Sequence, residues 1–142
     1  MTGRVVIALA VVAAAAVVAW RLERGRRAAP VRDAYPVPSQ LDRDDFPRPD
    51  APCLVALFSA ARCDSCRGLP EQLEALESDV VATAVVADED RRDLHRRYAI
   101  AGIPTVVVAD ADGVVRDSFV GPVAATELRA AVAAAREQAE QP

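Results

Sequence analysis

The sequence predicts an α/β domain in which helices flank a central mixed β-sheet, preceded by one N-terminal transmembrane helix. Short continuous apolar runs alternate with segments of helical periodicity, and a turn sequence separates the last two runs. An uninterrupted apolar run near the N-terminus predicts the membrane helix. We therefore expect a membrane helix or signal anchor at 1–23, a linker rich in proline and arginine at 24–50, and the α/β domain at 51–142.

The membrane helix is predicted from residues 5–20, which are all apolar and lie between Arg4 and Arg21. Sixteen residues make about 24 Å of helix, so we expect both arginines to snorkel and residues 4–22 to contact membrane lipid. The arginines that follow favour a single-pass protein whose domain lies on the cytoplasmic side. The alternatives are an extracytoplasmic domain, or secretion after cleavage of a signal peptide.

The linker contains many prolines, which disfavour continuous helix and sheet. One helical turn is expected around residues 39–46, with Ser39 as its N-cap and with Leu41 and Phe46 as apolar contacts. The domain pattern follows from residue 53 onward.

The sequence predicts a βαβ unit in the first half of the domain. Residues 53–58 form a continuous apolar run, as expected for a strand buried on both faces. A helix is predicted over 64–76 from leucines at helical spacing, and a second buried strand over 79–87. A polar helix over 88–98 follows, with Asp88 as its candidate cap.

The sequence predicts a β-hairpin followed by a helix in the second half of the domain. Residues 104–109 and 114–119 are predicted strands, joined by the turn sequence at 110–113. A final helix begins after residues 121–122, with Leu128 and Val132 on its inner face. The βαβ unit requires parallel strands and the hairpin antiparallel ones, so the sheet should be mixed.

Charge excludes one class of partner. Residues 39–142 hold 11 arginines against 19 aspartates and glutamates, which gives a net charge of −8. A domain this acidic is a poor partner for nucleic acid, because attraction to phosphate requires a basic face.

Two of the three cysteines, Cys63 and Cys66, have the C-x-x-C spacing and lie where the first predicted strand gives way to a helix. A helix N-terminus stabilises a thiolate, and this spacing brings both sulfurs within bonding reach. A zinc site is the alternative, but it needs further ligands. The remaining candidates are Cys53, expected to be a buried apolar residue at the far end of the strand, and His95, expected to be a solvated helix residue without a role. We therefore predict redox chemistry with no metal and no cofactor.

Residues 102–105, Gly-Ile-Pro-Thr, are the second signal, because proline is permitted at the first position of a strand. A strand-start proline is the simple interpretation. The alternative is a cis-proline loop beside the cysteines, which would leave the Ile103 backbone free to pair with a substrate peptide.

The segments 58–66 and 98–105, followed by Val120-Gly121, resemble the thioredoxin family in order and spacing over residues 50–138. The resemblance implies a thioredoxin-like fold and a protein-disulfide oxidoreductase. It implies that Cys63 attacks a substrate disulfide and Cys66 resolves the mixed disulfide. It also implies that Ile103, cis-Pro104 and Thr105 bind substrate.

The departures from the family lie around the cysteines. Arg62 replaces the usual tryptophan, and Asp64-Ser65 replaces the usual Gly-Pro. Leu57 occupies the position of the family's buried aspartate. Arg62 should lower the pKa of Cys63 and Asp64 should raise it. We expect a membrane-anchored enzyme that exchanges disulfides with protein or small-molecule thiols and receives electrons from an upstream reductant. A non-catalytic binding module at the membrane is the alternative.

Overall fold

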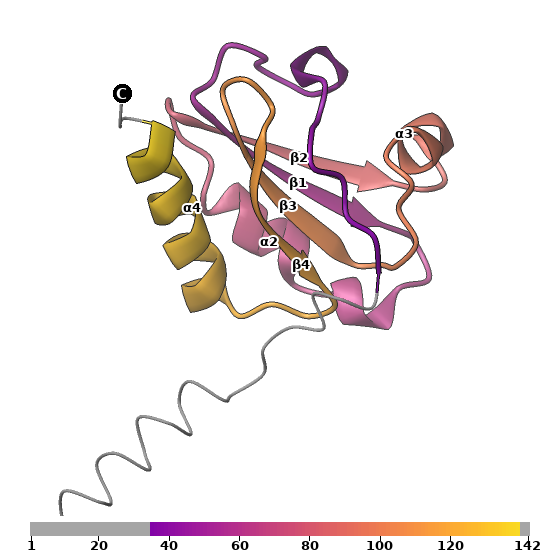
Figure 1. Cartoon of the computed structure of the whole chain (residues 1–142). Helices are drawn as coiled ribbons and strands as arrows, with labels where there is room; N and C mark the ends of the chain where they lie inside the picture. The colour runs from indigo at the N-terminus through magenta and orange to yellow at the C-terminus, as the bar shows by residue number, and fades with distance from the viewer. Residues whose placement is uncertain (1–34, 140–142) are drawn as a thin grey trace, which may run out of the picture.

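The computed structural model describes residues 35–139 and shows a four-stranded sheet with helices on both faces (Figure 1). The strands lie in the order β2-β1-β3-β4. β1 pairs with β2 in parallel and with β3 in antiparallel, and β3 and β4 form an antiparallel hairpin. The strands are β1 (Cys53–Ser59), β2 (Val81–Ala87), β3 (Thr105–Asp110) and β4 (Val115–Val120). The mixed sheet predicted from the sequence is confirmed.

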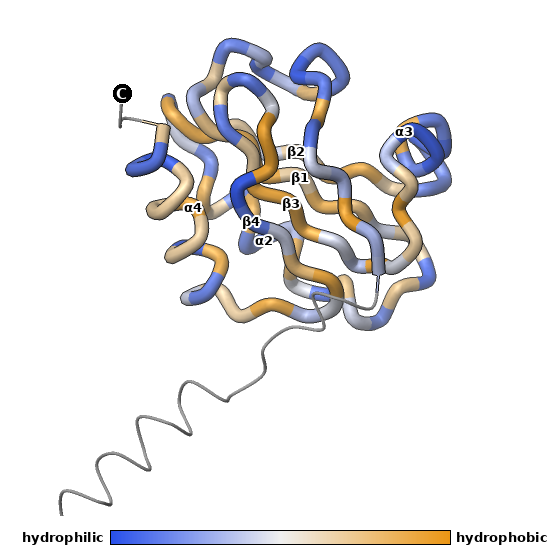
Figure 2. Tube along the Cα trace, in the orientation of Figure 1, coloured by the Kyte–Doolittle hydropathy of each residue, from blue (hydrophilic) through white to orange (hydrophobic). Residues whose placement is uncertain are grey.

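The core has two layers because successive β1 residues point to opposite faces of the sheet. Val55 and Leu57 lie in one apolar cluster, which contains residues of α2 (Leu69–Glu74) and α4 (Ala125–Ala139). Leu54 and Phe58 lie in the other, with residues of α3 (Arg92–Arg97) and of the segment before β1. All seven β1 residues are buried, and Figure 2 shows apolar residues along β1 and β3.

The predicted helix over 64–76 is wrong as one continuous element. It divides into a 3-10 turn, η2 (Asp64–Cys66), and the short helix α2. Gly68 separates them with a left-handed φ of 79°. Pro70 explains the break: inside a continuous helix it would remove a hydrogen bond and clash with the preceding turn, whereas the first turn of α2 tolerates it.

The helix predicted over 88–98 begins at Arg92, and Asp88 is not its N-cap. Instead, the backbone N–H of Asp88 donates to the Ser59 carbonyl at 2.9 Å, which joins the segment after β2 to the end of β1. Residues 88–91, which were predicted to form the first turn of the helix, therefore lie outside it.

The second half of the predicted linker packs on the sheet. Leu41 and Phe46 are buried beside β1, and Gln40 forms a β-bridge with Val114. The expected helical turn is η1 (Arg43–Asp45), and its N-cap is Asp42 rather than Ser39. Leu41 and Phe46 thus make the apolar contacts expected of them.

The predicted membrane helix at 1–23 lies outside the described residues. Between residues 35 and 139, no helix combines the length and apolar character needed to cross a membrane.

Candidate active site

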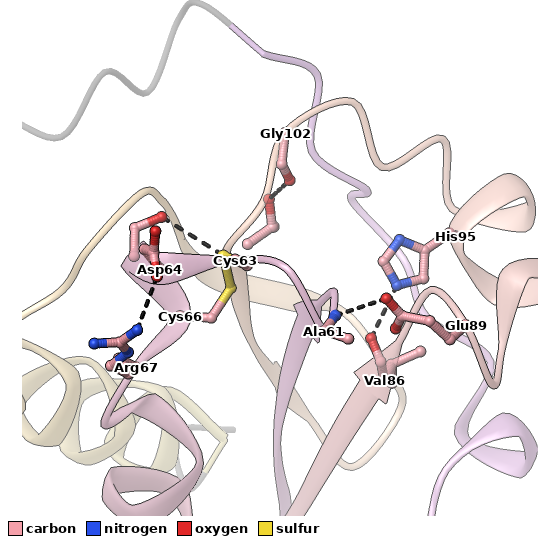
Figure 3. The surroundings of a disulfide bond; sticks show 11 residues. Ala61, Cys63, Asp64, Cys66, Arg67, Val86, Glu89, His95 and Gly102 are labelled. Carbon is pink, nitrogen blue, oxygen red and sulfur yellow. Dashed lines mark hydrogen bonds and ion pairs between the residues drawn. A yellow bond between two sulfur atoms is a disulfide. The ribbon is translucent and has the colours of Figure 1, made fainter.

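A disulfide joins Cys63 to Cys66 immediately after β1, with an S–S distance of 2.04 Å and Cα atoms 5.3 Å apart (Figure 3). Cys66 is 7 % exposed, whereas Cys63 is partly exposed. A pocket of about 530 Å³ opens beside both residues and the loop that carries them. An incoming group can therefore reach the sulfur of Cys63 more easily than that of Cys66.

Cys63 is the N-cap residue of η2, so it lies at a helical N-terminus as the sequence predicted. This helix, however, is only one turn long. A macrodipole grows with the number of aligned peptide units, so one turn contributes a weaker field than the continuous helix predicted from the sequence. The Ser65 hydroxyl lies 3.6 Å from the Cys63 sulfur and is the side-chain group that contacts it.

The charges beside Cys63 are unequal. Asp64 forms an ion pair with Arg67 at 2.9 Å, and both side chains are strongly exposed. Arg62 is exposed and has no hydrogen-bond or ion-pair partner among residues 35–139. The Asp64 carboxylate is thus partly neutralised, while the Arg62 guanidinium remains available to an anion.

The second part of the site is the loop before β3. The Ile103–Pro104 peptide bond is cis, as the alternative interpretation of the sequence expected. Thr105 pairs with Phe58, which places this loop at the sheet edge where β1 leads to Cys63. The Thr105 hydroxyl donates to the Gly102 carbonyl at 2.7 Å, and the Gly121 N–H donates to the Pro104 carbonyl at 2.8 Å. The loop is therefore held from both sides.

Ile103 presents a free backbone at this edge. Its side chain is 42 % exposed. Within the described part of the chain, neither its N–H nor its carbonyl has a hydrogen-bond partner. Pro104, in contrast, is fully buried. An extended peptide can therefore pair with Ile103 while Pro104 fixes the position of the loop.

The sequence reasoning missed a third loop, the one after β2. One carboxylate oxygen of Glu89 accepts the backbone N–H of Ala61 at 2.6 Å (Figure 3). This bond is the main cause that lowers the pKa of Glu89. Because β1 and β2 are parallel, their carboxyl ends meet at one edge of the sheet. Acidic residues directly after the second predicted strand were therefore the signal for this contact.

His95 corrects a second expectation, because it is buried rather than solvated, with 8 % of its surface exposed. Its Nε2 lies 2.9 Å from the Val86 carbonyl, and its ring stands edge-on to Phe58 with 5.3 Å between centroids. Four neighbouring arginines predicted exposure, but the ring packs inward against β1 and β2.

Cys53 is buried at the opposite end of β1 from the disulfide, and its thiol is free, as expected. Burial raises its pKa. In the part of the chain that the structure describes, no group of three or more His, Cys, Asp or Glu could hold a metal ion.

Several solved structures are similar to this chain. A thioredoxin of Fasciola hepatica is 27 % identical, with a TM-score of 0.53, over 61 % of this chain and 84 % of that one. A mutant thioredoxin of Halobacterium salinarum is 26 % identical, with a TM-score of 0.57, over 72 % and 91 % of the two chains. A Malassezia sympodialis thioredoxin, 22 % identical with a TM-score of 0.54 over 78 % and 96 %, supports the fold alone.

No curated protein sequence matches the chain. A family model described as a thioredoxin-like domain does match, over residues 40–136, which includes the disulfide and the cis-proline loop. The chain therefore belongs to the thioredoxin-like family.

Proposed function

We propose that this protein is a membrane-anchored thiol–disulfide oxidoreductase that works through Cys63 and Cys66. One observation carries the proposal: a disulfide with an accessible sulfur and a buried sulfur lies at the same sheet edge as the unpaired backbone of Ile103. A substrate peptide that pairs with Ile103 would bring its own disulfide to Cys63.

The reaction begins with the reduced dithiol. The Cys63 thiolate attacks one substrate sulfur, and a mixed disulfide forms as the other substrate sulfur leaves as a thiolate. The released substrate thiolate takes the proton of Cys66, and the Cys66 thiolate then attacks the Cys63 sulfur and releases the second substrate thiolate. The substrate gains two electrons and the protein ends with the Cys63–Cys66 disulfide. A dithiol reductant then restores the protein by the same exchange in reverse.

Arg62, Asp64 and Ser65 would tune the first step. The Arg62 guanidinium favours the Cys63 thiolate, and Asp64 opposes it less strongly because Arg67 pairs with Asp64. The Ser65 hydroxyl can donate to the thiolate from its place 3.6 Å away.

Anchoring through residues 4–22 would restrict this chemistry to substrates near the membrane. The arginines after the apolar run support a cytoplasmic domain, where thiols are kept reduced and the protein would act as a reductase. A C-terminal reporter fusion tests the orientation. Signal from a reporter active only outside the cytoplasm would contradict this orientation and favour the extracytoplasmic alternative.

The experiment that tests the function follows insulin reduction by dithiothreitol with the full chain. We expect catalysis by the wild type, loss of catalysis in Cys63→Ser, and a trapped mixed disulfide on Cys63 in Cys66→Ser. Cys53→Ala removes the third cysteine from the opposite end of β1 and should retain catalysis. Equal inactivity of the wild type and Cys63→Ser would contradict the proposal.

That negative outcome would favour the alternative, a thioredoxin-fold binding module. One observation supports it: Leu57 is fully buried in the apolar cluster behind the disulfide, at the position where the family resemblance implies a buried carboxylate that assists Cys66.

A further inference from the structure

Another pocket, of about 230 Å³, lies beside the Ile103 loop, and Ala60 lines both it and the pocket beside the cysteines. Asp88 and His95 line it from the segment after β2 and from α3, and the residues 100–103 line its other side. It therefore adjoins the backbone that a substrate peptide would pair with, but nothing in the disulfide exchange uses it.

The polar side chains that line this pocket, those of Asp88 and His95, can both accept hydrogen bonds. The Val86 carbonyl can only accept, so Nε2 of His95 carries a proton, and in the tautomer with this single proton Nδ1 carries a lone pair. In Figure 3 the second ring nitrogen is turned away from Val86. Nδ1 lies 4.0 Å from a carboxylate oxygen of Asp88, too far for a hydrogen bond. Among residues 35–139, Nδ1 has no hydrogen-bond partner.

Two acceptors 4.0 Å apart can share one donor group placed between them. A lysine ammonium has three N–H donors and an arginine guanidinium has five, so either can bind both acceptors at about 2.8–3.0 Å. A neutral amide has two N–H donors but no charge to offset the Asp88 carboxylate, and an acidic side chain has no donor. The pocket chemistry thus selects a cation.

The surrounding charge is consistent with this selection. Asp88 and Glu89 contribute two negative charges beside the pocket, whereas Arg91 is paired with Asp93. Arg92 reaches one oxygen of Asp88 at 3.6 Å, but its side chain is 65 % exposed and the Asp88 oxygen that faces His95 is the other one. The domain as a whole is acidic, which attracts basic polypeptides over longer distances.

We propose that the pocket between Asp88, His95 and Ile103 is a subsite for a lysine or arginine side chain of the substrate polypeptide, close in sequence to the disulfide that Cys63 attacks. The inference rests on the proposed function and assigns its preferred substrates: polypeptides in which a basic residue lies near the attacked cysteine.

The test compares kcat/KM for two sets of model peptides, each with one disulfide. The first set carries a single lysine one, two or three residues before or after the attacked cysteine, and the second carries norleucine there. We expect the wild type to favour lysine about fivefold at one of these positions, in the range of an exposed ion pair. In Asp88→Asn this ratio should fall close to one.

Asp112→Asn is the matched control, because it removes the same charge from the turn between β3 and β4, at the other end of the sheet. It should keep the lysine preference. Equal rates for lysine and norleucine in the wild type would overturn the subsite while the oxidoreductase stands, and so would a preference that persists in Asp88→Asn. Turnover of neither peptide set would overturn both proposals.

Discussion

The two ends of β1 differ in the number of hydrogen bonds that their polar groups make. At the start of β1, the buried Arg43 guanidinium donates to the carbonyls of Ala51, Asp110 and Arg48 at 2.9–3.1 Å. The Asp110 carboxylate accepts two backbone N–H groups of its turn and pairs with Arg116. These bonds tie the segment before β1 to the hairpin.

Near the end of β1, by contrast, an arginine and a backbone segment make no such hydrogen bonds with residues 35–139. Arg62 is unpaired and Ile103 has a free backbone within the described residues, and Cys63 is partly exposed. Cys53 at the start of β1 is buried and its thiol is free, whereas Cys63 after the end of β1 is in a disulfide. One end of the sheet is therefore held by many hydrogen bonds, whereas the other leaves a partly exposed cysteine and a free backbone, as the proposed disulfide exchange requires.

The largest expected effect concerns the reactivity of the two cysteines in the reduced protein. Cys53 is 1 % exposed and burial raises its pKa, so little thiolate forms at neutral pH and little of it can be reached. We expect iodoacetamide to modify Cys63 about a thousandfold faster than Cys53 at pH 8. Mass spectrometry of the alkylated peptides measures both rates. In urea, which unfolds the protein, the two alkylation rates should become similar. Similar rates in the folded protein would contradict the proposed difference between the two ends of β1.

Two glycines with the same backbone conformation provide the second comparison. Gly113 and Gly68 both have a φ of 79°, but a Cβ on Gly113 would lie 2.0 Å from the Leu41 carbonyl, whereas a Cβ on Gly68 would meet nothing within 4 Å. Gly113→Ala should lower the free energy of unfolding by about 3–4 kcal/mol and Gly68→Ala by about 1 kcal/mol. Urea unfolding of the oxidised protein checks both. Equal losses would mean that the packing at Gly113 contributes nothing.

Arg43→Ala should cost about 2–3 kcal/mol of unfolding free energy, because three carbonyls lose a charged donor while remaining near the start of β1. Arg96→Ala is the matched control, since Arg96 is exposed and should change stability by less than about 0.5 kcal/mol. If both variants unfold at the same urea concentration, the bonds of Arg43 are not what stabilises this end.

The order of elements could be predicted because it depends on local periodicity. The buried run at 53–58 and the turn at 110–113 are visible in the sequence, and β1, β3 and β4 follow from them. The C-x-x-C pair was equally visible, whereas the residues alone offered the cis-proline loop only as an alternative to a strand-start proline, which the family resemblance then favoured.

Contacts between residues distant in sequence could not be predicted in the same way. The Glu89 bond to Ala61 joins loops 28 residues apart, and the burial of His95 depends on a carbonyl at the end of another strand. The break in the helix at Gly68 could have been read from Pro70, which cannot occupy the interior of a helix that starts at Asp64.

The last expected effect is on the pH dependence of stability and concerns Tyr98, the C-cap residue of α3, which connects the turn around η1 to the helix that carries His95. Burial and the hydrogen bond that its hydroxyl donates to Asp45 raise the pKa of Tyr98 to about 12, from 10. The neutral phenol is favoured in the fold, so its contribution is complete below pH 10 and is lost as the pH rises to about 12. A shift of this size corresponds to about 3 kcal/mol.

The difference in phenolate absorbance between wild type and Tyr98→Phe isolates the titration of this one residue. We expect a midpoint near pH 12, and a fall in the unfolding free energy between pH 10 and 12 that Tyr98→Phe does not show. A midpoint near 10 would mean that neither burial nor the bond to Asp45 favours the neutral phenol. In that case the turn at residues 42–45 would not hold Tyr98 at the end of α3, and the place of His95 beside the proposed subsite for a lysine or arginine would depend on its contacts with β1 and β2 alone.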